Sequence, residues 1–262
     1  MSDLPGRRNR VIKEIAAVLK VVKLRHLLKA ILHPREELLA FKYHYRRVSE
    51  EEFVSFLAGP LAARSVLKAL AGELAAHESF HAALKEKLRL HSDGYGGQMT
   101  REAPAIYSLV RLLKPKVIVE TGVADGFTTS YILRALADNG EGRLYSIDLP
   151  HYLLPQAKQP GWIVEEGLRG RWELRVGDAA EVLPALLKEL GTVDMFLHDS
   201  LHTYDHMMLE FRAAWPHLKA GGLLLAHDVG TNHSFFDFIG EAGLKWKDWR
   251  VYHVLGGVRK PV

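Results

Sequence analysis

One stretch, residues 117–130, constrains the fold of this chain more than any other part of its sequence. It reads VIVETGVADGFTTS: an apolar, β-branched run ends at an acidic residue, glycines follow at positions 122 and 126, and the apolar spacing of a helix then begins. This order predicts a strand, a tight turn and a helix. Because glycine permits backbone conformations that other residues avoid, and because a helix N-terminus presents free N–H groups, the turn suits a nucleotide-like ligand.

The glycine spacing distinguishes two kinds of nucleotide site. The dinucleotide fingerprint G-x-G-x-x-G requires glycine where this chain has Ala124, so it is not met. An acidic residue before a G-x-x-x-G turn instead resembles motif I of class I S-adenosylmethionine-dependent methyltransferases. Taken alone, the turn also fits a strand-to-helix connection that binds no ligand. The resemblance implies that the cofactor contacts Glu120, Thr121, Gly122 and Gly126.

Two further acidic residues follow predicted strands. Asp148 ends a strand over residues 143–148 and lies 22 residues beyond Gly126, where nucleotide-binding α/β units place the acid that accepts hydrogen bonds from ribose hydroxyls. Asp178 also follows a predicted strand, and the resemblance places it, with Ala179, in the adenine region. Open parallel sheets bind ligands outside the carboxyl ends of their strands, so we expect these acids to meet at one site.

The most specific pattern lies in residues 193–228. The segment VDMFLHDSLHTY is followed by a helical pattern and then by GGLLLAHD. This closely resembles the sugar O-methyltransferases of macrolide biosynthesis and the related cephalosporin hydroxylase-like group. In those proteins an apolar strand, Asp-Gly-x-His-x-Tyr, a helix, Gly-Gly and a strand ending in an acidic pair follow one another. The resemblance covers residues 94–262 and implies methyl transfer to a hydroxyl.

The same resemblance implies that Asp199 and Asp228 bind a divalent cation such as Mg²⁺, a hard ion that carboxylates hold well. It makes Asp199 and His202 the catalytic residues, with His202 as general base, because imidazole titrates near neutral pH. The chain departs from the pattern at Ser200, where glycine is usual, and at His227, which replaces an acid. We expect His227 to join the metal ligands, although imidazole favours Zn, Mn or Fe over Mg. A hydrogen-bonding role for His227 and a metal-free transfer are the alternatives.

The sequence before this domain predicts a helical region over residues 1–93, with a role as a lid or in oligomerisation. Apolar and basic residues recur at helical intervals over 8–32, which predicts a basic amphipathic helix. We expect it to pack on its own domain or across a dimer; an anionic membrane or an acidic partner is the alternative. The turn-rich residues 91–100 mark the boundary. Further helices are predicted over 34–47, from Glu50 to near Gly59, and from Pro60 to about Leu90 with a bend near Gly72.

Within that last predicted helix, residues 77–81 read HESFH, which matches the H-E-x-x-H pattern of zinc peptidases. The longer pattern with a glycine and a third histidine fails, because those positions hold Leu84 and Lys87. We therefore interpret His77 and His81 as histidines on a polar helix face. A zinc peptidase that uses His77, Glu78 and His81 is the alternative from another functional class.

Composition sets outer limits on the function. The chain has 262 residues, 48% hydrophobic and 25% charged, with no cysteine, so disulfides and thiolate metal sites are excluded. No apolar run reaches the roughly 18 residues that a membrane span needs. Residues 1–50 hold 12 Lys/Arg against 5 Asp/Glu, and the rest holds 23 against 26. The main domain is therefore not expected to bind nucleic acid, and a cytoplasmic location without stable membrane insertion is the default expectation.

Together these patterns predict a doubly wound, Rossmann-like α/β sheet. They predict an S-adenosylmethionine-dependent O-methyltransferase that acts on the hydroxyl of a small molecule with help from a divalent metal, and that forms a homo-oligomer. The metal ligands are expected to be Asp199, His227 and Asp228. A sugar, a polyketide, a phenol and a small protein all remain open as acceptor. A metal-free methyltransferase and a non-catalytic cofactor-binding module are the other interpretations.

Overall fold

In the computed structural model we describe residue 32 and residues 34–89, 101–150 and 158–262. Apart from residue 32, the predicted helix over 8–32 lies outside these residues, as does the turn-rich boundary at 91–100. The chain divides into two units, Met1–Tyr45 and Arg46–Val262. The described part of the first unit is helix α2 (Pro34–Tyr45), as the sequence predicts.

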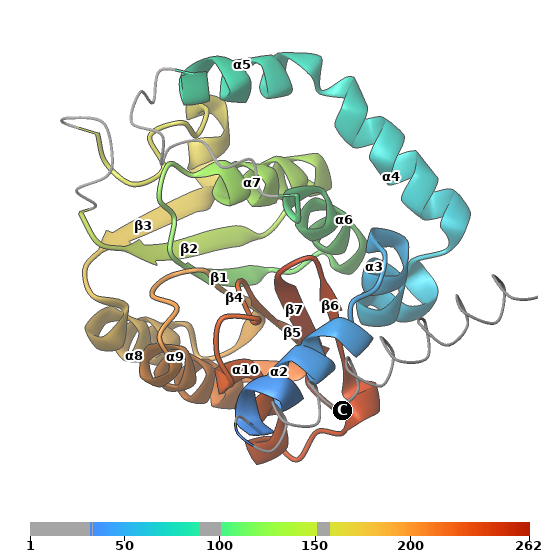
Figure 1. Ribbon diagram of the computed structural model, residues 1–262. Coiled ribbons are helices and arrows are strands. Elements are labelled where there is room, and N and C mark those ends of the chain that lie inside the picture. Colours follow the sequence, from blue (N-terminus) through green and yellow to red (C-terminus); the bar gives the residue numbers. More distant parts are fainter. Residues whose placement is uncertain (1–31, 33, 90–100, 151–157) are drawn as a thin grey trace, which may run out of the picture. The chain divides into compact units, whose positions relative to one another are not determined.

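A seven-stranded sheet forms the centre of the second unit (Figure 1). Its strand order is β3-β2-β1-β4-β5-β7-β6, so the chain runs outward from β1 in one direction and then returns to continue from β4 in the other. This confirms the predicted doubly wound sheet. The first five strands are parallel, and β7 pairs antiparallel with β5 and β6. The strands are β1 (Val117–Thr121), β2 (Arg143–Asp148), β3 (Trp172–Val176), β4 (Val193–His198), β5 (Leu218–Ala226), β6 (Trp249–Tyr252) and β7 (Leu255–Arg259).

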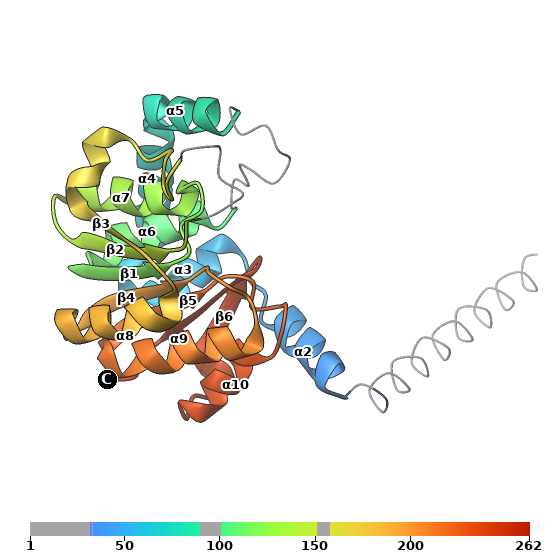
Figure 2. The same cartoon turned by 90° about the vertical axis from the view of Figure 1, so that its left-hand side faces the viewer.

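Helices cover both faces of the sheet (Figure 2). Alternate residues of a strand point to opposite faces, and here both sets are apolar, as expected for a sheet buried on both sides. Ile118, Met195 and Leu225 belong to the core on the first face, whereas Phe196 and Leu224 are buried on the opposite one. The first face carries α6 (Ala103–Leu113) and α7 (Phe127–Asn139); the second carries α8 (Ala179–Leu190), α9 (Tyr204–His217) and α10 (Ser234–Glu241).

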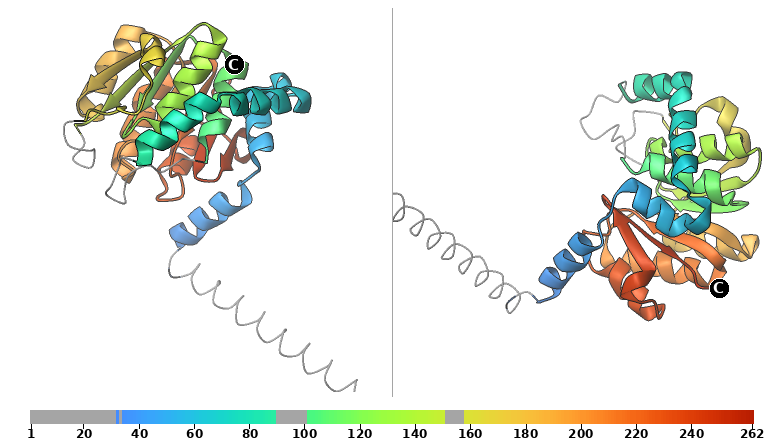
Figure 3. Two further views of the ribbon diagram at one scale, coloured as in Figure 1. Left: turned by 90° about the horizontal axis from the view of Figure 1, so that it is seen from above. Right: turned by 90° about the vertical axis from the view of Figure 1, so that its right-hand side faces the viewer.

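Three helices precede the sheet, on the side of its first face: α3 (Glu50–Ala58), α4 (Arg64–Ala76) and α5 (Glu78–Arg89) (Figure 3). Helix α3 contacts α6 and strands β6 and β7, whereas α4 packs on α6 and Phe80 of α5 packs on Tyr131 of α7. Ser49 caps α3 by accepting a hydrogen bond from the backbone N–H of Glu52. Phe53 and Leu57 are fully buried and share one hydrophobic core with the sheet. These helices therefore belong to the same compact unit as the sheet. The predicted role of residues 1–93 as a lid or in oligomerisation stays a prediction.

The prediction of a single helix from Pro60 to about Leu90 is wrong in detail. A short 3-10 turn, η1 (Gly59–Leu61), comes first, and the chain then breaks between α4 and α5 at His77 and not near Gly72. The N–H of His77 bonds to the carbonyl of Leu74, which ends α4 with a tighter turn. A bend at Gly72 is not needed, because glycine inside a helix weakens it by only about 1 kcal/mol.

A membrane span requires a helix that is both long and apolar. No single helix among the described residues meets both conditions. One bent pair, Glu50–Leu61 with Arg64–Ala76, meets them jointly by length and composition alone.

Candidate active site

The register of the central strands determines which residues meet at the carboxyl edge of the sheet. Thr121 pairs with His198, and His198 pairs with Ala226, so β1, β4 and β5 end side by side. The next residues continue this alignment, because the N–H of Asp199 bonds to the carbonyl of Thr121 and the N–H of His227 to that of His198, each at 2.8 Å. The strand order thus brings the glycine turn together with Asp199 and His227.

The glycine turn is held in shape by Asp148. Gly122, Ala124 and Gly126 all have positive φ angles, of 82°, 48° and 99°, which explains why glycine occupies two of the three positions. One carboxylate oxygen of Asp148 accepts hydrogen bonds from the N–H groups of Val123, at 2.9 Å, and Ala124, at 2.7 Å. Asp148 therefore lies beside the turn, as predicted, and anchors it. Its contact with a ribose stays a prediction.

Both glycines also allow close backbone contacts. A Cβ atom at Gly122 would lie 2.0 Å from the backbone oxygen of Asp199, and one at Gly126 would lie 2.7 Å from the Cα of Gly161. The chain around Gly161 is fixed on the turn by hydrogen bonds from its N–H to Ala124 and from the indole of Trp162 to Asp125. The glycines are thus required by the packing of the protein itself.

The side chains of Glu120 and Thr121 point to opposite faces of the sheet. Glu120 is buried and accepts hydrogen bonds from Thr129 and Ser146, at 2.9 and 2.7 Å. Burial raises the pKa of Glu120 to about 8, with smaller contributions from nearby carboxylates, although the two hydroxyls act to lower it. The Thr121 hydroxyl donates to Glu210 at 2.5 Å. Both side chains have protein partners, and their predicted contact with the cofactor stays a prediction.

Asp178 and Ala179 lie where β3 leads into α8. Asp178 is exposed and caps the helix, since its carboxylate accepts a hydrogen bond from the N–H of Ala180 at 2.8 Å. Ala179 is the first residue of the helix and is buried. Their location at a strand end agrees with the expected cofactor position, and contact with adenine stays a prediction.

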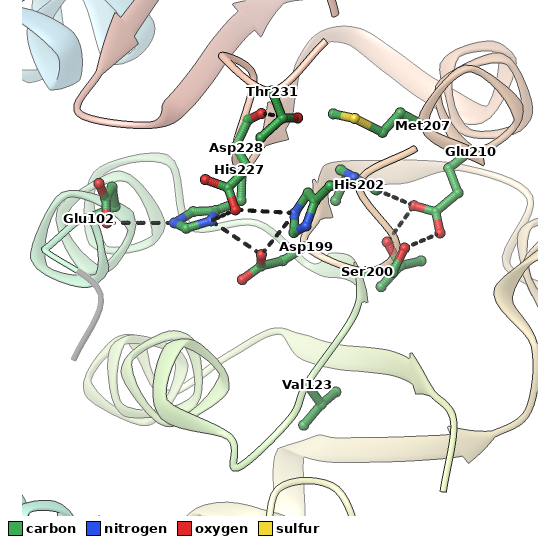
Figure 4. A network of polar contacts seen from close by, with 12 residues as sticks. Glu102, Val123, Asp199, Ser200, His202, Met207, Glu210, His227, Asp228 and Thr231 are labelled. Carbon is green, nitrogen blue, oxygen red and sulfur yellow. Dashed lines mark hydrogen bonds and ion pairs between the residues drawn. The ribbon is translucent and has the colours of Figure 1, made fainter. Parts of the chain in front are cut away.

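Two histidines and two aspartates converge beyond the ends of β4 and β5 (Figure 4). The Oδ1 atom of Asp199 lies 3.5 Å from His202 Nε2 and 3.3 Å from His227 Nδ1. The Oδ2 atom of Asp228 lies 3.8 and 3.7 Å from the same two nitrogens. Asp199, His202 and His227 have the mutual spacing of metal ligands, and Asp228 faces the same point. The structure therefore brings together all four residues that the sequence singled out here.

The cluster is electrostatically unusual. Burial alone would lower the pKa of His227, but the charge of Asp199 and contacts with Asp228 and Glu102 raise it to about 11. The contact with His227 in turn lowers the pKa of Asp228. Asp228 has a positive φ of 53°, a conformation that Asp tolerates better than most residues and that occurs preferentially at functional sites. Perturbed, converging groups of this kind are typical of active sites.

Sequence reasoning missed Glu210, a fully buried residue of α9 next to this cluster. Its carboxylate accepts hydrogen bonds from His198 at 2.6 Å, Ser200 at 2.7 Å and His206 at 2.9 Å, besides that from Thr121. Burial would raise the pKa of Glu210, yet these donors lower it to about 2. Because His198 and Ser200 flank Asp199, Glu210 fixes the loop that carries it. The sequence feature that could have pointed to Glu210 is a glutamate on the apolar face of a helix, between Met207 and Phe211.

The H-E-x-x-H motif does not form a metal site in this structure. Nε2 of His77 lies 3.0 Å from a carboxylate oxygen of Asp138, and Nε2 of His81 lies 2.8 Å from the carbonyl of Leu74. The helix break at His77 separates the two histidines, so they do not share one continuous helix. Among the described residues, the grouping with metal-ligand spacing is that of Asp199, His202 and His227.

Comparison with known proteins defines the class of this domain. Residues 119–229, from β1 to just beyond Asp228, match the family model of a methyltransferase domain. Together with the strand order and the glycine turn, this match agrees with the Rossmann-like methyltransferase fold that the sequence predicts.

The chain is similar to particular methyltransferases. It is 32% identical over 93 residues to a catechol O-methyltransferase of Niastella koreensis, an alignment that covers 35% of this chain and 40% of that relative. The chain thus matches less than half the length of this curated relative.

Two solved structures share the fold. A putative caffeoyl-CoA O-methyltransferase from Staphylococcus aureus has a TM-score of 0.53 and 18% identity, over 74% of this chain and 98% of that one. The O-methyltransferase TomG from Streptomyces achromogenes, in complex with SAM, has a TM-score of 0.52 and 19% identity, over 68% and 89%. These similarities confirm the Rossmann-like methyltransferase fold.

Proposed function

We propose that this protein transfers a methyl group from S-adenosylmethionine to a hydroxyl of a small molecule, with assistance from a divalent metal ion. The observation that carries the proposal is the convergence of Asp199, His202, His227 and Asp228 beside the glycine turn. The methyltransferase model matched by residues 119–229 and the catechol O-methyltransferase relative support the same reaction.

The roles of the residues follow from their positions. The turn from Gly122 to Gly126, with Asp148 and Asp178 at the neighbouring strand ends, would hold the cofactor. Asp199, His227 and Asp228 would hold the metal ion, and this donor set fits one because its charged and imidazole groups converge without close hydrogen bonds to one another. When bound, such an ion lowers the pKa of an acceptor hydroxyl.

His202 is proposed as the general base. Its Nε2 atom faces the two aspartates and has no hydrogen-bond partner among the described residues, so it is free to take the hydroxyl proton. As the acceptor oxygen gains the methyl group, the S–CH₃ bond breaks and the cofactor leaves in its demethylated form. Alignment of acceptor and methyl contributes most of the rate enhancement in this scheme.

Isothermal calorimetry tests the cofactor first. S-adenosylmethionine and its demethylated product should bind with one site per chain, and NADH should not. Binding of NADH without binding of S-adenosylmethionine would refute the proposal. A screen of hydroxylated sugars and phenols for methylation then identifies the acceptor. The proposal includes assembly as a homo-oligomer, a cytoplasmic location and no nucleic-acid partner, which light scattering, fractionation and binding assays test separately.

A further inference from the structure

The proposed metal site offers ligands that differ from those Mg²⁺ prefers. Mg²⁺ is usually bound in proteins by one or two carboxylates together with water and substrate oxygens. Here the two carboxylates, of Asp199 and Asp228, face two imidazole nitrogens, those of His202 and His227 (Figure 4). Imidazole is a better ligand for Mn, Fe, Co and Zn ions than for Mg²⁺. The types of ligand at this site therefore favour Mn, Fe, Co or Zn ions over Mg²⁺.

The spacing of the donor atoms supports a metal more than a hydrogen-bonded network. The four carboxylate–imidazole distances range from 3.3 to 3.8 Å. They exceed the roughly 2.7–2.9 Å of a charge-assisted hydrogen bond. Ligand atoms that each lie about 2.0–2.2 Å from one ion are separated from each other by roughly 3–3.5 Å. The side chains are thus close enough to share an ion and too far apart to satisfy one another well.

Glu102 lies beside the ring nitrogen of His227 that points away from the aspartates. This glutamate precedes α6, is almost fully buried, and lies with Oε2 3.6 Å from His227 Nε2. Its other oxygen accepts a hydrogen bond from the N–H of Val254 at 3.4 Å, which holds the carboxylate in place. A carboxylate beside one ring nitrogen attracts the N–H to that side and leaves the other nitrogen as the ligand. For His227 that other nitrogen is Nδ1, which faces Asp199.

We infer that this cluster is a site for a first-row transition-metal ion, such as Mn²⁺, Fe²⁺, Co²⁺ or Zn²⁺, and that Glu102 is the residue that positions His227 as its nitrogen ligand. The inference rests on the proposed function for the presence of a metal, and adds the class of ion and the residue that secures it. Asp199 and Asp228 supply the oxygen ligands. His202 keeps its place as base at the edge of the same cluster.

Metal titration of the full-length protein, after treatment with a chelator, tests the class of ion. We expect one Co²⁺ per chain, detected by visible absorption, with a dissociation constant at least about 100-fold below that of Mg²⁺. Pulsed electron paramagnetic resonance of bound Mn²⁺ should show coupling to an imidazole nitrogen. His227→Asp should shrink the preference for Co²⁺ over Mg²⁺ by about tenfold or more, because oxygen replaces nitrogen as the ligand.

Substitution of Glu102 tests its positioning role. Glu102→Leu should weaken Co²⁺ binding by about 10–100-fold, as is typical when the partner of a ligating histidine is lost. Glu102→Gln should recover most of that affinity, because its amide oxygen can still face Nε2 of His227 as the carboxylate does. The matched control is Glu73→Gln, which alters a carboxylate bound to Arg111 and Tyr107, away from the cluster. It should leave Co²⁺ affinity unchanged.

Mg²⁺ binding as tight as that of Co²⁺, or no binding of either ion, would overturn the inference. Co²⁺ affinity that is unchanged in Glu102→Leu would overturn the role of Glu102. If His227→Asp fails to fold, the ion preference of the unaltered protein still decides. Calorimetry with S-adenosylmethionine on the same samples separates this result from the proposed function. The cofactor still binds if only the metal inference is wrong, whereas a protein that binds Co²⁺ but no S-adenosylmethionine contradicts the function alone.

Discussion

Gly122 lies directly against Asp199: a Cβ atom at the glycine would come within 2.0 Å of the aspartate's backbone oxygen and 2.7 Å of the backbone nitrogen of Ser200. Gly122 is the first residue after β1, and Asp199 the first after β4. The glycine turn and the loop that carries Asp199 are thus in direct backbone contact. A change in one is expected to displace the other.

Gly122→Ala should therefore weaken the binding of both S-adenosylmethionine and the metal ion. The added methyl group would collide with the backbone of the Asp199 loop, and the positive φ of 82° adds strain for any residue with a side chain. We expect S-adenosylmethionine and Co²⁺ affinities each to fall by about tenfold or more, on the order of 1.4 kcal/mol or above. Calorimetry and metal titration measure both.

Gly140→Ala is the matched control for this change. Gly140 also has a positive φ, of 72°, but a Cβ atom there would meet nothing within 4 Å. It should cost about 1 kcal/mol of stability from backbone strain and leave both affinities unaltered. Normal binding of both ligands by Gly122→Ala would show that the contact between the two loops does not matter.

Glu210→Gln should destabilise the fold. The carboxylate is completely buried and accepts hydrogen bonds from four side chains, two of them histidines. Gln keeps the shape but removes the charge and turns one acceptor into a donor that faces other donors. Loss of one partner in a buried ionic network costs roughly 3–5 kcal/mol. Urea unfolding at pH 7 measures this difference.

The effect of this substitution should depend on pH in a defined direction. The folded pKa of Glu210 is about 2, below its ordinary value of 4.5. A lowered pKa stabilises the fold fully above pH 4.5, and that contribution is lost as the pH falls towards 2. The stability difference between the two proteins should therefore shrink over that range. Glu241→Gln, which breaks an exposed ion pair with Arg212, should leave the stability nearly unchanged. If the stability difference between Glu210→Gln and the unaltered protein stayed constant at every pH, this account would be contradicted.

The sequence predicted the strand ends and their acids because each depends on local patterns. The β-branched run before Gly122, the spacing to Asp148 and the Gly-Gly before β5 are visible within short windows. Parallel pairing then aligns the carboxyl ends, so the meeting of Asp199 with Asp228 follows from the fold class alone.

Other features could not be predicted because their partners come from distant elements. Glu210 is bound by residues of β1, β4 and the following loop, and only the assembled sheet brings these together. His77, at the break between α4 and α5, likewise has its side-chain partner far away, because Asp138 lies 61 residues along the chain. The cofactor contacts of Glu120 and Thr121 stay a prediction, but their partners in the fold, Ser146 and Glu210, come from other elements and could not be predicted from a local pattern.

The zinc-peptidase interpretation and our proposal differ in what His77 and His81 do. If these histidines held zinc, the double substitution to Ala would remove a stoichiometric metal. We expect the double variant to bind Co²⁺ as the unaltered protein does, because both rings are engaged with Asp138 and the Leu74 carbonyl. Elemental analysis after dialysis decides between them. The variant should be less stable by about 1–2 kcal/mol through the lost hydrogen bonds.

The last prediction separates the roles of Asp199 and His202. Asp199→Asn should abolish turnover and weaken metal binding, yet leave S-adenosylmethionine affinity nearly unchanged, because the cofactor is expected at the turn and not at this side chain.

His202→Ala should still bind the metal ion and S-adenosylmethionine, and should slow turnover by about 10²–10⁴-fold, the usual effect of a lost general base. Its rate should partly recover at high pH, where the acceptor ionises unaided. Single-turnover assays with the acceptor found by screening make the measurement. Full activity of His202→Ala with chemistry rate-limiting would remove its role as base, and loss of Co²⁺ from that variant would make it a metal ligand. Activity of Asp199→Asn in the presence of a chelator would instead favour a metal-free transfer.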